Sequence, residues 1–221
     1  MYKREQSVDA RRNIQEGTVM SANSNYWGDR LDAKKGVEKT IISLVCETAK
    51  SHGYAIAGKS LVKKFPNGNL GVIAFQSIGG SDPQLRPTVN VVSINLAKVL
   101  KPGKKATAND VHASEFLAAL DDAPNTFADG SDFTVFRCRV REQQNDVAAA
   151  IVLRLDSAGF KWIEDRCEDA QIALDLHESG PVQRKWAAVL DDIVSGRSPQ
   201  LSVLEPTLSI ARVTRNSKGS G

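Results

Sequence analysis

Apolar residues recur at spacings of three and four near the start of the patterned part of the chain. Val37, Ile41 and Val45 lie on one face of such a helix, and Asp32 can cap its first turn. Gly53 supplies the left-handed residue that commonly ends a helix. The spacing therefore predicts an amphipathic helix of about 18 residues.

β-prone runs follow this helix. Residues 54–65 and 70–78 are separated by Pro66-Asn67-Gly68-Asn69, and Asn-Gly is a strong hairpin signal because both residues tolerate positive φ. Residues 79–87 form a Gly/Pro-rich loop, and residues 88–100 alternate well enough to predict a further strand. These runs predict a hairpin followed by a third strand.

The second half of the chain contains one more strand pattern and then returns to helical spacing. Residues 133–140 alternate, and a helix is predicted from Asn145 with an interruption at Gly159. Further helices are predicted at about 165–177 and 182–194.

The order of these elements predicts an α+β fold. Strands joined in succession by a tight turn pair antiparallel, and helices at either end of that run bury their apolar stripes on the sheet. We therefore expect an antiparallel sheet of about four strands with helices packed on one face, which is a two-layer sandwich.

Polar ends predict a single domain with tails. Residues 1–30 are interpreted as a mobile arm, residues 31–195 as the α+β domain and residues 196–221 as a C-terminal extension. Residues 101–131 are irregular, enclose a short helical pattern at 109–120 and are interpreted as an insertion.

Composition narrows the class of protein. The chain has 221 residues, of which 41% are hydrophobic and 25% charged, and this balance excludes collagen-like, low-complexity and wholly disordered proteins. No apolar run approaches the ~18 residues of a membrane-spanning helix, and residues 1–13 lack a signal-peptide core. A cytoplasmic protein without membrane contact is expected. The net charge of +3 is far from that of a dedicated nucleic-acid binder.

Residue types that carry catalysis or metal binding are scattered. The cysteines are expected to be reduced and buried, acidic pairs are expected on solvated helix ends, and no nucleotide-binding or nucleophile-elbow motif occurs. Neither the histidines nor the cysteines lie at metal-ligand spacing: His52, His112, His177, Cys46, Cys138 and Cys167. We therefore expect no metal, no cofactor and no catalytic residue.

The most informative charges lie on the strand predicted at residues 133–140. Alternation places Phe136 and Cys138 on one face and Arg137, Arg139 and Arg141 on the other, at intervals of about 6.8 Å. Guanidinium groups bind carboxylates and phosphates in a bidentate manner, so this row is a candidate binding surface. The alternative is a solvated outer face whose charges pair across strands.

Further candidate binding residues lie on the hairpin and beside the loop that follows it. Lys59, Lys63 and Lys64 are expected to extend the arginine-bearing face into a basic stripe. Gln76, shortly before the Gly/Pro-rich loop at 79–87, and Arg86, within that loop, are also candidate binding residues.

Several short strings resemble the bacterial family described as domain of unknown function 4304. The resemblance spans about residues 33–178, outside both tails. It is carried by four strings: His52-Gly53-Tyr54, Val72-Ile73-Ala74-Phe75-Gln76-Ser77, Thr88-Val89-Asn90-Val91 and Ser157-Ala158-Gly159-Phe160-Lys161-Trp162-Ile163. Members of such families often occur in toxin, immunity or defence gene neighbourhoods, so the resemblance implies a binding role.

Three functional hypotheses remain open. The first is a non-enzymatic interaction protein, similar to immunity or defence accessory proteins, that binds a partner protein through the basic sheet face or the loop at 79–87. The second is a nucleic-acid-binding protein that uses the arginine row and the basic residues of the arm: Lys3, Arg4, Arg11 and Arg12. The third is an enzyme that uses scattered carboxylates or His112. Oligomeric state is left open.

The first two hypotheses require that the arginine-bearing side of the sheet faces solvent. Arg139→Ala is then expected to change stability by less than about 0.5 kcal/mol. Phe75 and Trp162 are instead expected in the core, where truncation to Ala costs about 3–5 kcal/mol.

Overall fold

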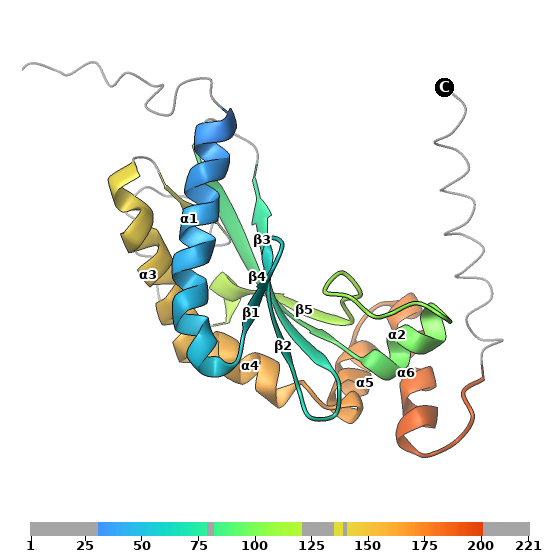
Figure 1. Ribbon diagram of the computed structural model, residues 1–221. Coiled ribbons are helices and arrows are strands. Elements are labelled where there is room, and N and C mark those ends of the chain that lie inside the picture. The colour runs from blue at the N-terminus through green and yellow to red at the C-terminus, as the bar shows by residue number, and fades with distance from the viewer. Residues whose placement is uncertain (1–30, 79–81, 121–134, 139–140, 201–221) are drawn as a thin grey trace, which may run out of the picture.

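A computed structural model describes residues 31–78, 82–120, 135–138 and 141–200 of the chain. The architecture is α+β, with an antiparallel sheet and two groups of helices (Figure 1). One group covers a face of the sheet: α1 (Leu31–Ala49), α3 (Gln144–Arg154) and α4 (Phe160–Asp165). The other group lies at one end of the sheet: α2 (Ile94–Leu100), α5 (Asp169–Glu178) and α6 (Pro181–Val194).

The sheet is antiparallel throughout its described strands, as predicted, and contains more strands than expected. Five of them are hydrogen-bonded in chain order: β1 (Ala55–Ala57), β2 (Ser60–Lys64), β3 (Leu70–Ser77), β4 (Gln84–Val92) and β5 (Ala113–Phe116). The short strand β6 (Phe136–Arg137) pairs with β4 instead of extending the sheet.

The predicted hairpin is confirmed. Its turn is closed by the amide of Phe65, which donates to Asn69 O at 2.9 Å, and by the amide of Gly68, which donates to Phe65 O at 2.9 Å. The run 54–65, however, is two strands instead of one. Gly58, with φ 66°, starts the two-residue turn between β1 and β2, and a side chain there would strain the backbone.

Two boundaries around β4 differ from the prediction. The strand begins at Gln84, so Arg86 lies within β4 instead of in the preceding loop. It ends at Val92, and residues 94–100, predicted as strand, form α2. Ser93 caps this helix because its Oγ accepts a hydrogen bond from the amide of Leu96 at 3.1 Å. Over so few residues, the apolar pattern fits either a strand or a short helix. The Ser93 cap favours the helix.

The region predicted as a helix at 109–120 is instead strand β5 followed by the short 3-10 helix Leu117–Ala119. Pairing with β4 overrides the local helical pattern. Ser114 lies opposite Asn90, and its Oγ donates to Asn90 Oδ1 at 2.6 Å. The segment interpreted as an insertion therefore contributes a strand to the sheet.

Gly159 does not break its helix. α3 continues through a π-helical turn, Leu155–Gly159, directly into α4. A Cβ at position 159 would lie 2.8 Å from Leu117 Cδ1 and 2.9 Å from Leu155 Cδ2. The glycine therefore allows close approach of the helix to the segment after β5.

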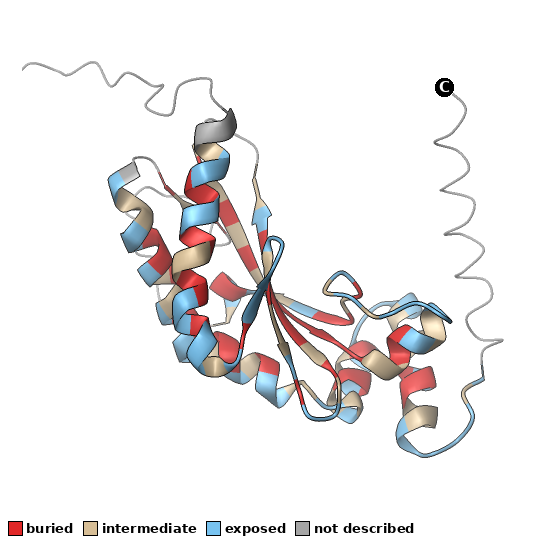
Figure 2. Cartoon of the chain, in the orientation of Figure 1, coloured by how far each residue is buried: buried red, intermediate tan, exposed pale blue. Residues whose placement is uncertain are grey.

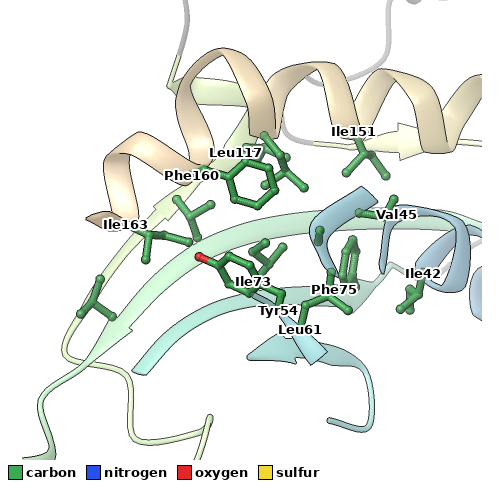
Figure 3. Packing of buried hydrophobic residues seen from close by; sticks show 14 of the residues in the cluster. Ile42, Val45, Tyr54, Leu61, Ile73, Phe75, Leu117, Ile151, Phe160 and Ile163 are labelled. Carbon is green, nitrogen blue, oxygen red and sulfur yellow. The ribbon is translucent and has the colours of Figure 1, made fainter. Parts of the chain in front are cut away.

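The core fills the space between the sheet and the helices α1, α3 and α4 (Figure 3). The helices carry both buried and exposed positions, whereas β3 and β4 contain runs of buried residues (Figure 2). Phe75 is 3% exposed and belongs to the core as predicted. Trp162 packs against the core but is only half-buried, so it is not a fully buried core aromatic. Cys46 and Cys138 are buried, whereas Cys167 is partly exposed. Within the described ranges, no helix is long and apolar enough to cross a bilayer.

Candidate functional site

Strand register determines which face of the sheet each candidate residue occupies. Gln76 lies opposite Arg86 in the β3–β4 pair, and Arg137 lies opposite Gln84 in the β4–β6 pair. Residues paired in this way share a face, and their immediate neighbours lie on the other. Those neighbours, Phe75, Leu85 and Phe136, belong to the buried core beneath the helices. Gln76, Arg86 and Arg137 therefore share the face opposite α1, α3 and α4.

An aromatic ring belongs to the same surface. Phe116 pairs with Thr88, two residues from Arg86, and the Arg86 guanidinium lies 5.5 Å from its ring centroid. Phe116 is 38% exposed and Gln76 is exposed, whereas both arginines are partly buried. We call Gln76, Arg86, Phe116 and Arg137 the arginine face. It lies at the β3–β4 end away from α2, α5 and α6 (Figure 1).

Part of this side of the sheet is closed. Val72 is fully buried and Asn90 is 3% exposed, although both lie on the same side of the sheet as Arg86. Asn90 is held by neighbouring strands, since its Nδ2 donates to Val72 O at 3.2 Å. On this side of the sheet, Gln76 and Phe116 are exposed and Arg86 and Arg137 are partly exposed, whereas Val72 and Asn90 are closed.

The predicted arginine row is not continuous along one strand. Arg137 is the last residue of β6, and Arg139 lies outside the described residues. Arg141 begins the 3-10 helix Arg141–Gln143, so its prediction as a strand residue is wrong. In β6, Phe136 and Arg137 pair with β4. Arg86, contributed by β4, is the described arginine that stands beside Arg137.

The lysines do not form a single stripe with the arginines. Lys63 lies opposite Gly71 on the helix-covered side of the sheet, so its predicted place on the arginine-bearing side is wrong. Its Nζ lies 3.0 Å from Glu164 Oε1 and 5.0 Å from the ring centroid of Phe65. Lys64 is exposed and lies opposite Leu70, at the far end of β3 from Gln76.

Lys59 belongs to a polar cluster that links the β1–β2 turn to α1. Its Nζ donates to Ser77 Oγ at 2.8 Å, and Ser77 Oγ donates to Glu38 Oε2 at 2.6 Å. Glu38 is 3% exposed, and its other oxygen, Oε1, has no hydrogen-bond partner among the described residues. Sequence reasoning missed Glu38. The available signal was its position four residues before Ile42, on the apolar stripe of α1.

A groove opens beside this cluster, between α1 and the β1–β2 turn. Its volume is about 330 Å³, and its lining is mostly apolar. Ile42 and Ile56 line it, and Ile56 is 52% exposed. Three lysines stand around it: Lys35, Lys39 and Lys59. We call this cavity the Glu38 groove.

A second cleft, of about 350 Å³, lies between β5 and the helices α4, α5 and α6. His112 lines it, but its Nδ1 accepts a hydrogen bond from the amide of Ser93 at 2.9 Å. Burial lowers the pKa of His112 to about 4, so the ring is neutral at pH 7 with its proton on Nε2. Arg166 Nε lies 3.0 Å from Asp175 Oδ2 across the same cleft. His112 and Arg166 are therefore both engaged by other described residues.

Neither the potential metal ligands among the described residues nor comparisons with known proteins indicate a function. The described residues contain no group of three or more potential metal ligands. Comparison with family models, curated proteins and solved structures finds no match for this chain. The resemblance to domain of unknown function 4304 therefore stays a prediction.

Proposed function

We propose that this chain is a binding protein that holds an acidic partner protein on the arginine face. The observation that carries this proposal is the register of β3, β4 and β6, which gathers Gln76, Arg86 and Arg137 on the side of the sheet opposite the helices α1, α3 and α4. The described helices lie on the other side or at the other end of the sheet (Figure 1).

The chemistry of this surface suits carboxylates of a folded partner. Arginine guanidinium groups bind carboxylates through two parallel hydrogen bonds, and arginine and aromatic residues are enriched at the energetic centres of interfaces. Arg86 and Arg137 are partly buried, and the Arg86 guanidinium lies 5.5 Å from the ring centroid of Phe116. Phe116 supplies apolar area beside them, and the amide of Gln76 supplies both a donor and an acceptor.

Nucleic acid is the less favoured ligand for the same charges. Single-stranded binding uses several stacked aromatic rings along a basic groove, whereas Phe116 is the exposed aromatic that the described residues place beside the arginines. Fluorescence anisotropy with DNA and RNA oligonucleotides distinguishes the two ligands. Binding to nucleic acid would weaken steeply as salt is raised.

The proposal is tested by co-expressing the chain with the products of the genes that flank its own and measuring complexes by size exclusion and calorimetry. We expect a stoichiometric complex whose Kd rises at least tenfold, about 1.4 kcal/mol, on Arg86→Glu or Arg137→Glu. Lys104→Glu, an exposed loop position, makes the same charge change as a control. Absence of any complex, or equal affinity of the three variants, contradicts the proposal.

A further inference from the structure

The Glu38 groove lies against an unpaired sheet edge. β1 pairs with β2 and is the outer strand of the described sheet, and all three of its residues are exposed. Ala57 lies opposite Ser60 across the two-residue turn, which makes this a hydrogen-bonded pair. Pairs alternate along an antiparallel ladder, so the N–H and C=O of Ile56, opposite Leu61, point away from β2. This edge can accept one more strand.

The groove contains a buried acceptor without a donor. Glu38 lines the groove; its Oε2 is engaged by Ser77, whereas Oε1 is buried without a hydrogen-bond partner among the described residues. A buried carboxylate oxygen left without a donor is unfavourable. A segment bound in the groove can satisfy this oxygen only when the Glu38 side chain turns toward the cavity.

The rim of the groove selects for negative charge. Lys35, Lys39 and Lys59 are exposed side chains around the cavity. Glu38 contributes a single carboxylate, and Lys59 Nζ lies 3.7 Å from its Oε2. The local balance is positive. Carboxylates on either side of an apolar side chain match this rim, while a basic segment is repelled.

We infer that the Glu38 groove is the docking site for an extended acidic segment of a partner protein. The segment adds a strand to β1 through the backbone of Ile56, and one apolar side chain enters between Ile42 and Ile56. Acidic residues next to that side chain meet the three lysines. The inference does not depend on the arginine face, which occupies the other side of the sheet.

The test is a selection from a displayed library of random heptapeptides on the full chain. We expect enrichment of peptides with an apolar residue flanked by Asp or Glu. For the most enriched peptide, fluorescence anisotropy is expected to show at least a tenfold rise in Kd on Ile56→Asp or Lys39→Glu. The matched controls are Leu153→Asp, an exposed apolar position on α3, and Lys104→Glu, and both are expected to leave Kd unchanged. Slower hydrogen exchange of the Ile56 amide with peptide bound reports strand addition.

Several outcomes overturn the inference. These are no enrichment, enrichment of basic or uncharged peptides, and a Kd that Ile56→Asp and Lys39→Glu leave unchanged. Self-association of the free chain that Ile56→Asp abolishes shows that a second copy is the occupant instead. The selection is repeated on Arg86→Glu, where peptide binding is expected to persist. Loss of binding at the arginine face and loss of binding at the Glu38 groove are therefore distinguished.

Discussion

Ser77 donates a 2.6 Å hydrogen bond to Glu38, a carboxylate that is 3% exposed in the helix-covered side of the protein. This bond joins the end of β3 to the first half of α1. It gives Oε2 of Glu38, which lies on the apolar stripe of α1, a hydrogen-bond donor. The pair therefore links an inner strand of the sheet to the helix that covers it.

Ser77→Ala is expected to destabilise the protein by about 1.5–3 kcal/mol, because the buried carboxylate loses a charge-assisted hydrogen bond. Urea denaturation followed by circular dichroism measures the change. Ser51→Ala removes an exposed hydroxyl that bonds Thr48 O, and it serves as a control with an expected change below about 0.5 kcal/mol. Equal effects of the two substitutions would contradict the role assigned to Ser77.

The aromatic residues Phe75 and Trp162 are expected to respond differently to truncation. Phe75→Ala removes a side chain that is 3% exposed within the core, and the expected cost is about 3–5 kcal/mol. Trp162 is half-buried beneath the Arg166 guanidinium, which lies 4.6 Å from its ring centroid. Trp162→Ala is therefore expected to cost about 1–2 kcal/mol. Denaturant midpoints of the two variants show which substitution destabilises the protein more.

Gly159→Ala is expected to destabilise the protein although alanine favours helices. The added Cβ meets Leu117 Cδ1 at 2.8 Å, and overpacking of this kind costs about 1–3 kcal/mol, which outweighs a propensity gain of about 1 kcal/mol. A double-mutant cycle with Leu117→Ala tests the cause. If contact with Leu117 is responsible, Gly159→Ala is expected to cost less in the Leu117→Ala background; additive effects would refute it.

Protonation of His112 is expected to weaken the fold in mild acid. Its pKa in the folded protein is lowered from 6.5 to about 4 by burial, so between these values the unfolded chain binds the additional proton. Titration of His112 therefore leaves the free energy of unfolding unchanged above pH 6.5 and lowers it by about 3 kcal/mol as the pH decreases toward and below 4.

Free energies of unfolding measured from pH 7 to pH 4 test this expectation. In His112→Asn the amide oxygen can replace Nδ1 as the acceptor for Ser93, while the titrating group is absent. The variant is expected to lose less stability than the wild type over the same range. Parallel curves for the two proteins would mean that other groups cause the acid sensitivity.

Local pattern was sufficient for elements whose residues meet neighbours along the chain. The helix that ends before Gly53, the hairpin at Asn67-Gly68 and the C-terminal helices follow from spacing and turn chemistry within a few residues. The burial of Phe136 and Cys138 likewise follows from alternation. Such signals require no knowledge of distant segments, and they were enough for the fold class.

Tertiary contact decided the rest. β5 is a strand because β4 offers it backbone partners, and Lys63 lies under the helices because pairing with β3 places it there. Arg86 stands near Arg137, and Glu38 meets Ser77, through pairings between segments far apart in the chain. A one-residue change of register would exchange the two faces of a strand. The sequence alone therefore determines which side chains of a strand share a face. Only the assembled sheet determines which side chains of different segments meet.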